Sequence, residues 1–501
     1  MSSPDLKIRP WKLFSRSLKD LSYYVGSTFV GNDIQFTGIT IDSRFVESGD
    51  LFIALQGAKE HGAIYAAEVV NKGAAAILTD SFGAKILSTL IPVIIVENPR
   101  MWVGAISAWF YNNPSSALDV IGITGTNGKT TTAALVEEIW RLDGRMTGFI
   151  GTIGIRINNE NYATSFTTPE GTDLQGILAA MREQHVRNVV MEVSSHALSM
   201  HRVIGTHFKV VGFTNLTQDH LDFHGDMENY FRAKAELFAL DYADSAIVNL
   251  DNLYGVKLFD SFKIPTKTYS RSHREADWHY QNYETSTNGI GFEVSIRGPG
   301  GVLIEGHLPL IGIHNLDNTL LAIALTVESG VDPIAVAAYL GNLSAPVGRL
   351  EPIDVGQKFL ALVDYAHTPD AVAHALKSAK SMTKGKVIAV LGCGGDRDKG
   401  KRAIMGQALR AGADFAVFTS DNPRTEDPMQ ILMQMVGEGH NDNEVVELDR
   451  RSAIAIAVLQ AEPGDCVIVL GKGHERGQEI NGIKHLFDDR IELAHAIEDL
   501  E

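Results

Sequence analysis

Apolar and polar positions along the chain predict strands that alternate with amphipathic helices. Short apolar runs such as "LFIAL" (51–55) and "PVIIVE" (92–97) lie among helical stretches near the start of the chain. Further on, "DVIGITG" (119–125), "NVVMEVSS" (188–195) and "FKVVGFTNL" (208–216) are again separated by segments with helical periodicity. Because parallel strands need a crossover between them, this alternation predicts parallel sheets covered by helices.

The chain divides into three blocks, and we expect each block to be a domain. At 501 residues the chain is too long for a single hydrophobic core. The turn-rich stretch "YNNPSSALDV" separates residues 1–112 from residues 113–344, and the third block, residues 345–501, begins near "SAPVGRLE". Residues 275–310 interrupt the second block with a pattern that predicts a β-hairpin insertion. The predicted fold class is α/β with three domains.

The third block contains four predicted strands that each end in a polar or glycine-rich turn. They are "FLALVDYAH", "KVIAVLGCGG", "DFAVFTSDNP" and "DCVIVLGKGHE". In open α/β sheets, ligands bind beyond the carboxyl ends of the strands. These four turns are therefore candidate binding elements.

Composition narrows the class of protein. Apolar residues make up 45% of the chain and charged residues 21%, as in ordinary globular proteins. The net charge of -17 argues against nucleic-acid binding, and neither a run of 18 apolar residues nor a signal peptide is seen. Cys393 and Cys466 adjoin apolar strand-like segments, which favours buried thiols over a disulfide. We expect a cytoplasmic monomer that does not insert into a membrane.

The stretch "VIGITGTNGKTTTA" (120–133) is a shortened form of a phosphate-binding loop. The full loop reads G-x-x-x-x-G-K-[ST], and here Ile123 stands where its first glycine belongs. A strand, a glycine turn, a lysine and hydroxyls that open a helix still direct backbone N–H groups at a polyphosphate. Lys129 is placed to reach the phosphates and Thr130 to ligate Mg²⁺. The alternative is an ordinary glycine turn before a helix.

Three further side chains are candidates for metal chemistry, each with a simpler alternative. Glu192 ends a predicted strand and is an oxygen ligand suited to Mg²⁺, or else a solvated carboxylate. His220 and His224 have the spacing of a zinc pair, but neither H-E-x-x-H nor a cysteine partner accompanies them, which disfavours zinc. Lys234 lies inside a predicted helix, where a surface lysine is the simple alternative.

Ten motifs along the chain together resemble those of the Mur ligases, the ATP-dependent enzymes that extend the stem peptide of peptidoglycan. In order they are "GTNGKTT", "TTP", "MEVSSH", "NLTQDHLDFHG", "HNLDN", "GRLE", "DYAHTPDA", "GCGGDRDKGKR", "DNPR" and "GKGHE". The resemblance covers nearly the whole chain, and the shortened loop is this family's usual form. Within the family, the motifs are most similar to those of the member that adds the third residue of the stem peptide.

The resemblance implies an ATP-dependent acid–amino-acid ligase. Such an enzyme adds meso-diaminopimelate to UDP-N-acetylmuramoyl-L-alanyl-D-glutamate through an acyl phosphate, in peptidoglycan precursor synthesis that serves cell-wall growth, cell shape and cell division. The implied domains are an N-terminal UDP-binding domain, a central P-loop ATPase-like sheet with a β insertion, and a C-terminal Rossmann-like domain. The first step brings two anions together, so catalysis is expected to be electrostatic and positional.

The resemblance also assigns the catalytic residues Lys129, Glu192, His220 and Lys234. Thr130 and Glu192 are expected to hold one Mg²⁺ ion, and His220 to contribute to a second. Lys234 is expected to be carbamylated by CO₂, which turns an ammonium that repels Mg²⁺ into a carbamate with two oxygen ligands. Forming the carbamate requires a neutral amine, which a cationic neighbour favours.

The ATP-binding residues implied by the resemblance surround the loop and reach into the third block. Arg349 lies where the second and third blocks meet, so it is a candidate for coupling ATP binding to domain closure. His367 is interpreted as structural. The full predicted set is Gly125, Thr126, Asn127, Gly128, Lys129, Thr130, Thr131, Asn315, Arg349 and Asp364.

The residues expected to bind the UDP-muramoyl dipeptide are Ser43, Thr167, Thr168, Ser194 and Arg202. Taken alone, Ser43 of "TIDSR" is better explained as a helix-cap or turn serine. At Met200, two residues before Arg202, relatives often carry a polar side chain. This departure puts one hydrogen bond to the substrate in doubt.

The residues expected to bind diaminopimelate are Arg397, Asp421, Asn422, Pro423, Arg424, Gly471 and Glu475. Diaminopimelate differs from lysine by one carboxylate, and the planar fork of an arginine such as Arg424 pairs with a carboxylate through two bonds. Glu475 suits an ammonium group. "DNPR" therefore disfavours the lysine-adding enzyme, the D-Ala-D-Ala-adding enzyme and folylpolyglutamate synthetase. A non-catalytic ATP-binding switch is the remaining alternative. In such a protein Glu192, His220 and Lys234 would not be expected to lie close together.

Overall fold

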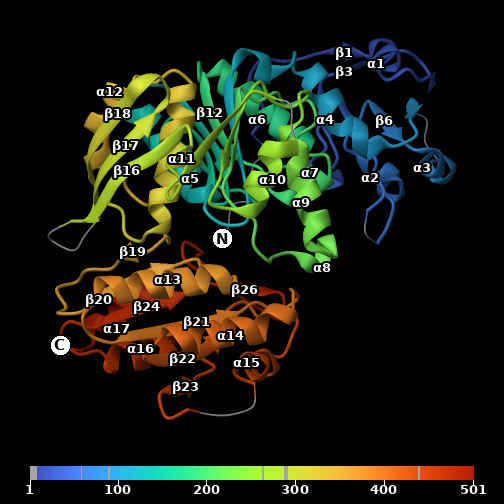
Figure 1. The fold of residues 1–501 in the computed structure, drawn as a ribbon. Coiled ribbons are helices and arrows are strands. Elements are labelled where there is room, and N and C mark those ends of the chain that lie inside the picture. Colours follow the sequence, from blue (N-terminus) through green and yellow to red (C-terminus); the bar gives the residue numbers. More distant parts are fainter. Residues whose placement is uncertain are drawn as a thin grey trace.

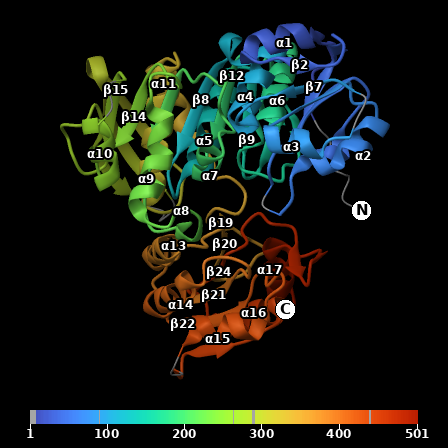
Figure 2. The same cartoon turned by 90° about the vertical axis from the view of Figure 1, so that its right-hand side faces the viewer.

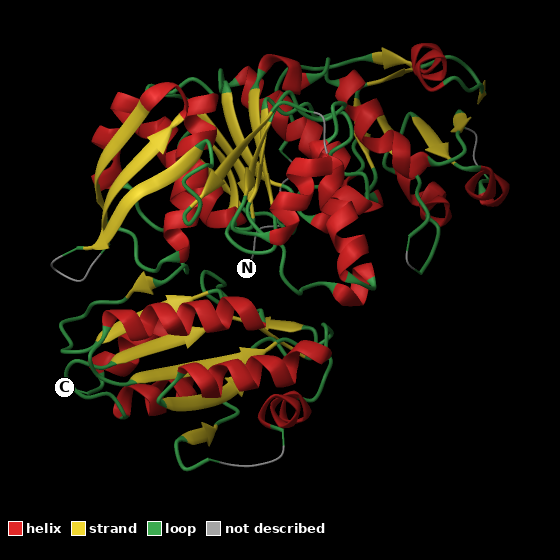
Figure 3. Ribbon diagram, in the orientation of Figure 1, coloured by secondary structure: helices red, strands yellow, loops and turns green. Residues whose placement is uncertain are grey.

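Three sheets, one in each block of the sequence, form the framework of the protein (Figure 1). The computed structural model describes residues 8–57, 59–88, 91–261, 264–286, 291–437 and 441–500. Helices cover the sheets (Figure 3), and the third block lies to one side of the other two in both orthogonal views (Figure 2). The predicted α/β class is confirmed. The domain boundaries at 112/113 and 344/345 stay a prediction.

The first block is built on a five-stranded sheet that is parallel except at one edge. Its order is β2 (Phe29–Val30), β7 (Val93–Ile95), β6 (Ala76–Thr79), β5 (Asp50–Ile53) and β4 (Gly38–Thr40), with β2 antiparallel. A separate pair joins β1 (Arg16–Ser17) to β3 (Gln35–Phe36). The helices are α1 (Leu18–Val25), α2 (Ala66–Asn71), α3 (Ser81–Ile86) and α4 (Pro99–Phe110).

The second block contains an eleven-stranded sheet with a parallel centre and antiparallel edges. The parallel strands are, in sheet order, β9 (Thr147–Gly151), β12 (Asn188–Glu192), β8 (Asp119–Thr124), β13 (Val210–Phe213), β14 (Ala246–Asn249) and β15 (Thr266–Ser270). One edge adds β10 (Gly154–Ile157) and β11 (Glu160–Tyr162). At the other edge β16 (Trp278–Thr285) runs parallel to β15, and the antiparallel strands β17 (Phe292–Gly298) and β18 (Val302–Leu308) follow it, which confirms the predicted hairpin insertion.

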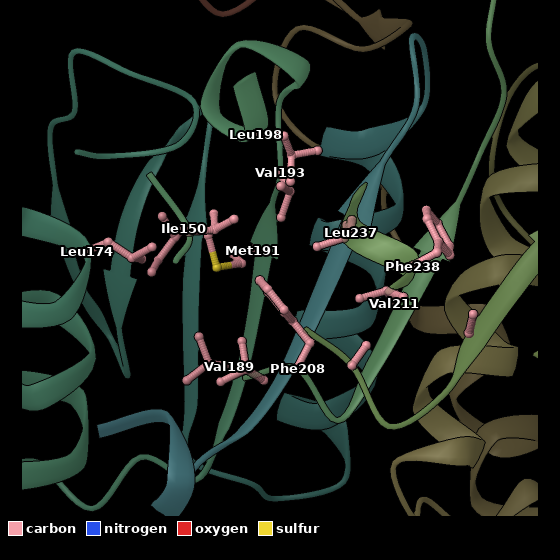
Figure 4. Packing of buried hydrophobic residues seen from close by; sticks show 14 of the residues in the cluster. Ile150, Leu174, Val189, Met191, Val193, Leu198, Phe208, Val211, Leu237 and Phe238 are labelled. Atoms are coloured by element: carbon pink, nitrogen blue, oxygen red, sulfur yellow. The ribbon is translucent and has the colours of Figure 1, made fainter. Parts of the chain in front are cut away.

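Two hydrophobic cores lie on opposite faces of this central sheet, because successive strand residues point to opposite sides. Val120 and Val189 pack into one core and their neighbours Ile121 and Val190 into the other. Figure 4 shows the first core, which includes Leu174. The helices of that face include α6 (Gly171–Glu183), α9 (Met227–Ala235) and α10 (Leu253–Ser261); the other face carries α5 (Lys129–Leu142), α11 (His314–Glu328) and α12 (Pro333–Tyr339). The short helices α7 (Ser195–Ser199) and α8 (Leu221–His224) follow β12 and β13.

The third block forms a six-stranded sheet that is parallel except for its first strand. Its order is β19 (Glu351–Pro352), β20 (Leu360–Asp364), β24 (Cys466–Leu470), β21 (Val387–Cys393), β22 (Phe415–Ser420) and β23 (Glu444–Val446). Its helices are α13 (Pro369–Met382), α14 (Gly400–Gly412), α15 (Pro428–Val436), α16 (Arg450–Leu459) and α17 (Asp489–Glu498), and β25 (Gln478–Ile480) pairs with β26 (Ile483–His485). Cys393 and Cys466 are buried and free, as predicted.

The register of the parallel strands brings the predicted site residues to one edge of each sheet. Glu192 pairs with Ile123, and Phe213 pairs with Thr124, so β8, β12 and β13 all end beside the glycine loop. The four strands predicted in the third block are β20, β21, β22 and β24, and their polar turns likewise share one edge. In the described part of the chain, no helix has the length and apolar character needed to cross a membrane.

Candidate active site

The glycine loop between β8 and α5 depends on two glycines that no other residue fits. Gly125 has φ +143° and Gly128 has φ +87°. A Cβ at Gly125 would lie 1.9 Å from the Thr214 hydroxyl, and a Cβ at Gly128 would lie 2.3 Å from Asn318 Oδ1. No side chain caps α5 at Gly128, so the first amide groups of this helix remain for an anion. This geometry disfavours an ordinary turn.

Two lysines from different helices meet at the carbonyl group of Gly125. Lys129 Nζ donates to Gly125 O at 2.9 Å and to Thr126 O at 2.8 Å, and Lys234 Nζ donates to Gly125 O at 2.7 Å. Burial places the pKa of Lys234 well below its ordinary value, and the charge of Lys129 lowers it further, against the opposing effect of Asp219. Lys234 is 1% exposed, so the surface-lysine alternative is wrong.

Glu192 is fully buried beside the loop, so the alternative of a solvated carboxylate is also wrong. Its Oε2 accepts from the Thr130 hydroxyl at 2.9 Å and from the Thr152 hydroxyl at 3.2 Å, and its Oε1 accepts from the Thr152 amide at 2.8 Å. All these hydrogen-bond donors are neutral, and the nearby ammonium of Lys129 interacts with Glu192 through its charge alone. A hydroxyl beside a buried carboxylate is a hard oxygen donor set that fits Mg²⁺. Thr152 was missed in the sequence because no motif contains it.

His220 lies next to this centre and is held by the preceding residue. Its Nε2 lies 3.4 Å from Asp219 Oδ2, and its ring centroid lies 4.8 Å from that of His196. Burial lowers the pKa of His220 to about 3, although Asp219 opposes the shift, so its ring is neutral at pH 7. A neutral imidazole is able to ligate a metal. Asp219 was missed although it stands inside a quoted motif.

The structure gives no support to a zinc pair. His224 Nε2 contacts the Ser195 hydroxyl at 2.9 Å. Across the residues that the structure describes, no three His, Cys, Asp or Glu side chains are arranged to hold a metal ion. The magnesium site therefore stays a prediction, with the ligands Thr130, Glu192, His220 and carbamylated Lys234. Of these, Thr130 and Glu192 are directly hydrogen-bonded to each other.

The predicted ATP-binding residues outside the loop are brought next to it. Asn315 accepts from Asn318, whose Oδ1 faces Gly128. Arg349 Nη2 donates to the Thr130 hydroxyl at 3.4 Å, while its buried Nε has no partner in the described structure. Asp364 accepts from the amides of residues 350 and 366, so it supports the backbone around Arg349.

The third block contacts the loop of the second block through polar side chains. Asn127 Nδ2 donates to Asp370 Oδ2 at 3.2 Å, and Lys401 Nζ lies 3.9 Å from Asp219 Oδ1. With the Arg349–Thr130 bond, these contacts place the two sheet edges against each other. The site predicted to lie between the blocks thus draws on both.

Four of the five residues predicted to bind the UDP-muramoyl dipeptide lie together beside Glu192. Thr167 contacts Thr152 through hydroxyls 3.0 Å apart, and the Thr168 hydroxyl donates to Glu192 O at 2.9 Å and accepts from the Ser194 amide at 3.0 Å. Arg202 donates to Thr168 O at 3.1 Å.

Two features of this group were not foreseen. Arg202 pairs with Glu170 at 2.9 Å, and Glu170 also pairs with Arg100 of the first block at 2.6 Å. Glu170 directly follows the "TTP" motif, a signal that the sequence offered. Met200 Sδ lies 3.6 Å from Arg202 Nη2. Ser43 lies apart, in the turn after β4, where Asp42 caps the short 3₁₀ helix Ser43–Phe45.

The residues predicted to bind diaminopimelate meet at the carboxyl edge of the third sheet. A Cβ added at Gly394 would lie 3.0 Å from Arg424 Nη1 and 3.8 Å from Arg397 Cγ, so the two arginines flank this glycine. Arg424 Nη1 also donates to Gly395 O at 2.6 Å. Its side chain is 22% exposed, which is compatible with contact to a ligand.

The carboxylates of this group lie on the turns that follow β22 and β24. Asp421 and Asn422 are each 8% exposed and precede Pro423 and Arg424. Asn422 Nδ2 donates to Glu475 Oε2 at 2.9 Å. A Cβ at Gly471, which has φ +113°, would lie 2.7 Å from Asp421 Oδ2. Arginines and carboxylates thus lie on turns at the same edge of the third sheet, which suits an amino acid with several charges.

The fold and this site define a multi-sheet α/β protein with a nucleotide-type glycine loop in its central sheet. Family models described as "Mur ligase family, catalytic domain", "Mur ligase middle domain" and "Mur ligase, glutamate ligase domain" match residues 35–111, 123–326 and 348–473. The chain belongs to the Mur ligase family. The resemblance carried by the ten motifs is confirmed, and with it the prediction of a ligase.

Individual relatives cover nearly the whole chain. The UDP-N-acetylmuramoyl-L-alanyl-D-glutamate--2,6-diaminopimelate ligase of Streptomyces avermitilis is 45% identical over 498 residues, which is 98% of each protein. A solved structure of a ligase with the same name is 33% identical and has a TM-score of 0.65, covering 93% of this chain and 95% of its own. The MurF ligase from Thermotoga maritima in complex with ADP is 16% identical, has a TM-score of 0.63, and covers 92% of this chain and 97% of its own, which shows the fold alone.

Proposed function

We propose that this protein is the ATP-dependent ligase that joins meso-diaminopimelate to UDP-N-acetylmuramoyl-L-alanyl-D-glutamate in peptidoglycan precursor synthesis. Relatives that bear this activity in their names, among them that of Streptomyces avermitilis, support the substrates. The observation that carries the proposal is the convergence of Lys129, Lys234 and the Thr130–Glu192 pair on one glycine loop. A protein that only binds ATP has no need of this buried charge.

The loop and its cations suit the first step. The substrate carboxylate attacks the γ-phosphate of ATP, a P–O bond to ADP breaks, and an acyl phosphate forms. Lys129 is anchored 2.8–2.9 Å from two loop carbonyls, and Arg349 of the third block reaches the Thr130 hydroxyl through Nη2. These cations offset the repulsion between the two anions. Use of ATP agrees with the ADP-bound relative that shares the fold.

In the second step the amine of the amino acid attacks the acyl carbon. A C–N bond forms, the C–O bond to phosphate breaks, and the amine loses a proton. The carboxylates Glu475 and Asp421 suit the ammonium groups of the incoming amino acid, and Arg397 and Arg424 suit its carboxylates.

Thr130, Glu192 and His220 would hold Mg²⁺, which when bound supplies positive charge to the phosphates. The depressed pKa of Lys234 provides the neutral amine that reacts with CO₂ to give a carbamate and release a proton. The carbamate would place two oxygens beside Gly125, where the ammonium now lies. A cytoplasmic location and a monomeric state belong to the same proposal.

Incorporation of labelled amino acid tests the function. The purified full-length chain is expected to transfer meso-diaminopimelate to the UDP-muramoyl dipeptide only with ATP and Mg²⁺, and to transfer L-lysine far more slowly. ATP turnover should require both other substrates. ATP hydrolysis without them, or equal incorporation of both amino acids, would contradict the proposal, and omission of each substrate in turn is the control.

A further inference from the structure

Two buried cations lie beneath the diaminopimelate turns, and no predicted role accounts for them. The side chains of Arg450 and Lys472 are both 0% exposed. Burying a charge costs several kcal/mol in order of magnitude unless close partners compensate it. The partners of each cation therefore indicate its task.

Arg450 joins the ends of two strands that are not neighbours in the sheet. It is the first residue of α16, and its Nε and Nη2 donate to Asp489 at 2.8 and 2.7 Å. Its remaining donors reach Ser420 O at 3.2 Å and Leu470 O at 2.8 Å, the last residues of β22 and β24. Strand β21 lies between these two strands, so the guanidinium spans its end.

The carbonyls bound by Arg450 directly precede the residues predicted to recognise the amino acid. Ser420 is followed by Asp421, and Leu470 is followed by Gly471. A Cβ at Gly471 would lie 2.7 Å from Asp421 Oδ2, so the two turns already touch. A small shift of either strand end would therefore change the space between them.

Lys472 links the same two turns through side chains. Its Nζ donates to Asn422 Oδ1 at 3.1 Å and to Glu475 Oε2 at 3.0 Å. Asn422 also donates to Glu475 Oε2 at 2.9 Å and accepts from the Glu479 amide at 2.9 Å. These two bonds hold the Glu475 carboxylate in place. Its side chain is still 32% exposed, so it remains accessible to a ligand.

We propose that Arg450 and Lys472 are positioning residues for the amino-acid substrate, which fix the Asp421–Arg424 turn against the Gly471–Glu475 turn. The inference rests on the proposed function. Without these cations Asp421 and Glu475 lose a compensating charge, repel each other and separate. A displacement of about 1 Å at a binding group is enough to cost about 100-fold in rate. The UDP-muramoyl residues lie in the first two blocks, so the affinity for the UDP-muramoyl dipeptide should change little. Asp364 O accepts from the Gly471 amide at 3.0 Å, so the affinity for ATP should change less than that for the amino acid but more than that for the dipeptide.

The test measures three Michaelis constants in full-length Lys472→Met and Arg450→Lys variants. Lys472→Met removes the charge but keeps the length of the side chain. Arg450→Lys keeps the charge opposite Asp489 but loses the fork that reaches both carbonyls. Arg410→Lys is the matched control, since Arg410 binds Glu444 at 2.6 and 2.9 Å and Val436 O at 2.7 Å, beside β23.

We expect KM for meso-diaminopimelate to rise by about tenfold or more in both variants, with a smaller rise in KM for ATP and with KM for the UDP-muramoyl dipeptide within about twofold of wild type. The Arg410→Lys control should leave all three constants unchanged. Lys472→Arg, which keeps the charge, should recover part of the lost affinity.

Melting curves of the variants show whether they fold, and the activity of the wild type shows whether the proposed function itself holds. Equal increases in all three constants, an unchanged KM for the amino acid, or loss of the folded transition in both variants would overturn the inference, since the cations would then serve stability alone. If the wild type itself does not use meso-diaminopimelate, the proposed function fails instead.

Discussion

Replacement of Arg424 by alanine should reduce the preference for meso-diaminopimelate over L-lysine. The backbone of Arg424 is fixed on both sides, because its N–H donates to Glu479 O at 3.0 Å and its carbonyl accepts from Asn481 at 2.7 Å. The substitution therefore removes the guanidinium and its bond to Gly395 O, while the turn keeps these two backbone hydrogen bonds. L-lysine lacks the second carboxylate that this fork is expected to bind, so its use should hardly change.

The size of the effect follows from the surroundings of the side chain. Losing one partner of a desolvated charged bond costs roughly 2–5 kcal/mol. Arg424 is 22% exposed and lies 3.6 Å from Glu479, which partly compensates it, so the lower half of that range applies. A loss of about 2–3 kcal/mol corresponds to about 30–150-fold in kcat/KM for meso-diaminopimelate. The value for L-lysine should change by less than about threefold.

The assay is incorporation of each labelled amino acid at saturating ATP and UDP-muramoyl dipeptide. Arg424→Lys, which keeps the charge but not the fork, should give an intermediate loss. Arg476→Ala is the control, since that side chain is 81% exposed and lies 3.9 Å from Asp488. An unchanged ratio of the two kcat/KM values, or an equal loss for both amino acids, would refute the reasoning.

Three other predictions follow from the site and the core. Lys234→Ala should lose activity, and a short carboxylate, which supplies the missing oxygens, should restore part of it; a variant that is active without this rescue would contradict the carbamate. Gly125→Ala places a Cβ 1.9 Å from the Thr214 hydroxyl at φ +143°, so it should cost roughly 3 kcal/mol and abolish nucleotide binding, as read from melting and titration. Stability should fall as pH falls from about 6.5 towards 4, because the unfolded chain binds more protons than the native one in that range, and a melting temperature that is constant between pH 7 and 5 would argue against it. The groups responsible are four histidines whose pKa burial lowers to about 4: His224, His314, His367 and His474.

Sequence patterns alone predicted the three sheets, the antiparallel insertion and the position of the glycine loop. These features depend on local spacing: apolar runs of strand length, helical periodicity between them, and glycines where φ is positive. Burial of Cys393 and Cys466 followed from their apolar neighbours for the same reason. The order of ten motifs was enough for the family, since each motif is read along the chain.

Contacts between distant residues were decided only by the tertiary structure. Lys234 lies 109 residues from Gly125, and its burial against that carbonyl depends on how α9 packs beside the end of β8. The same holds for Glu192, which had equally good interpretations as a buried ligand and a solvated carboxylate until strand order placed it beside Thr130 and Thr152. Arg450 gave no signal, and Lys472 stands inside the motif "GKGHE" but was given no role, because a cation in a helix or turn looks the same in sequence whether it is exposed or buried. Charge burial and partner choice arise from packing across strands, which spacing along the chain does not encode.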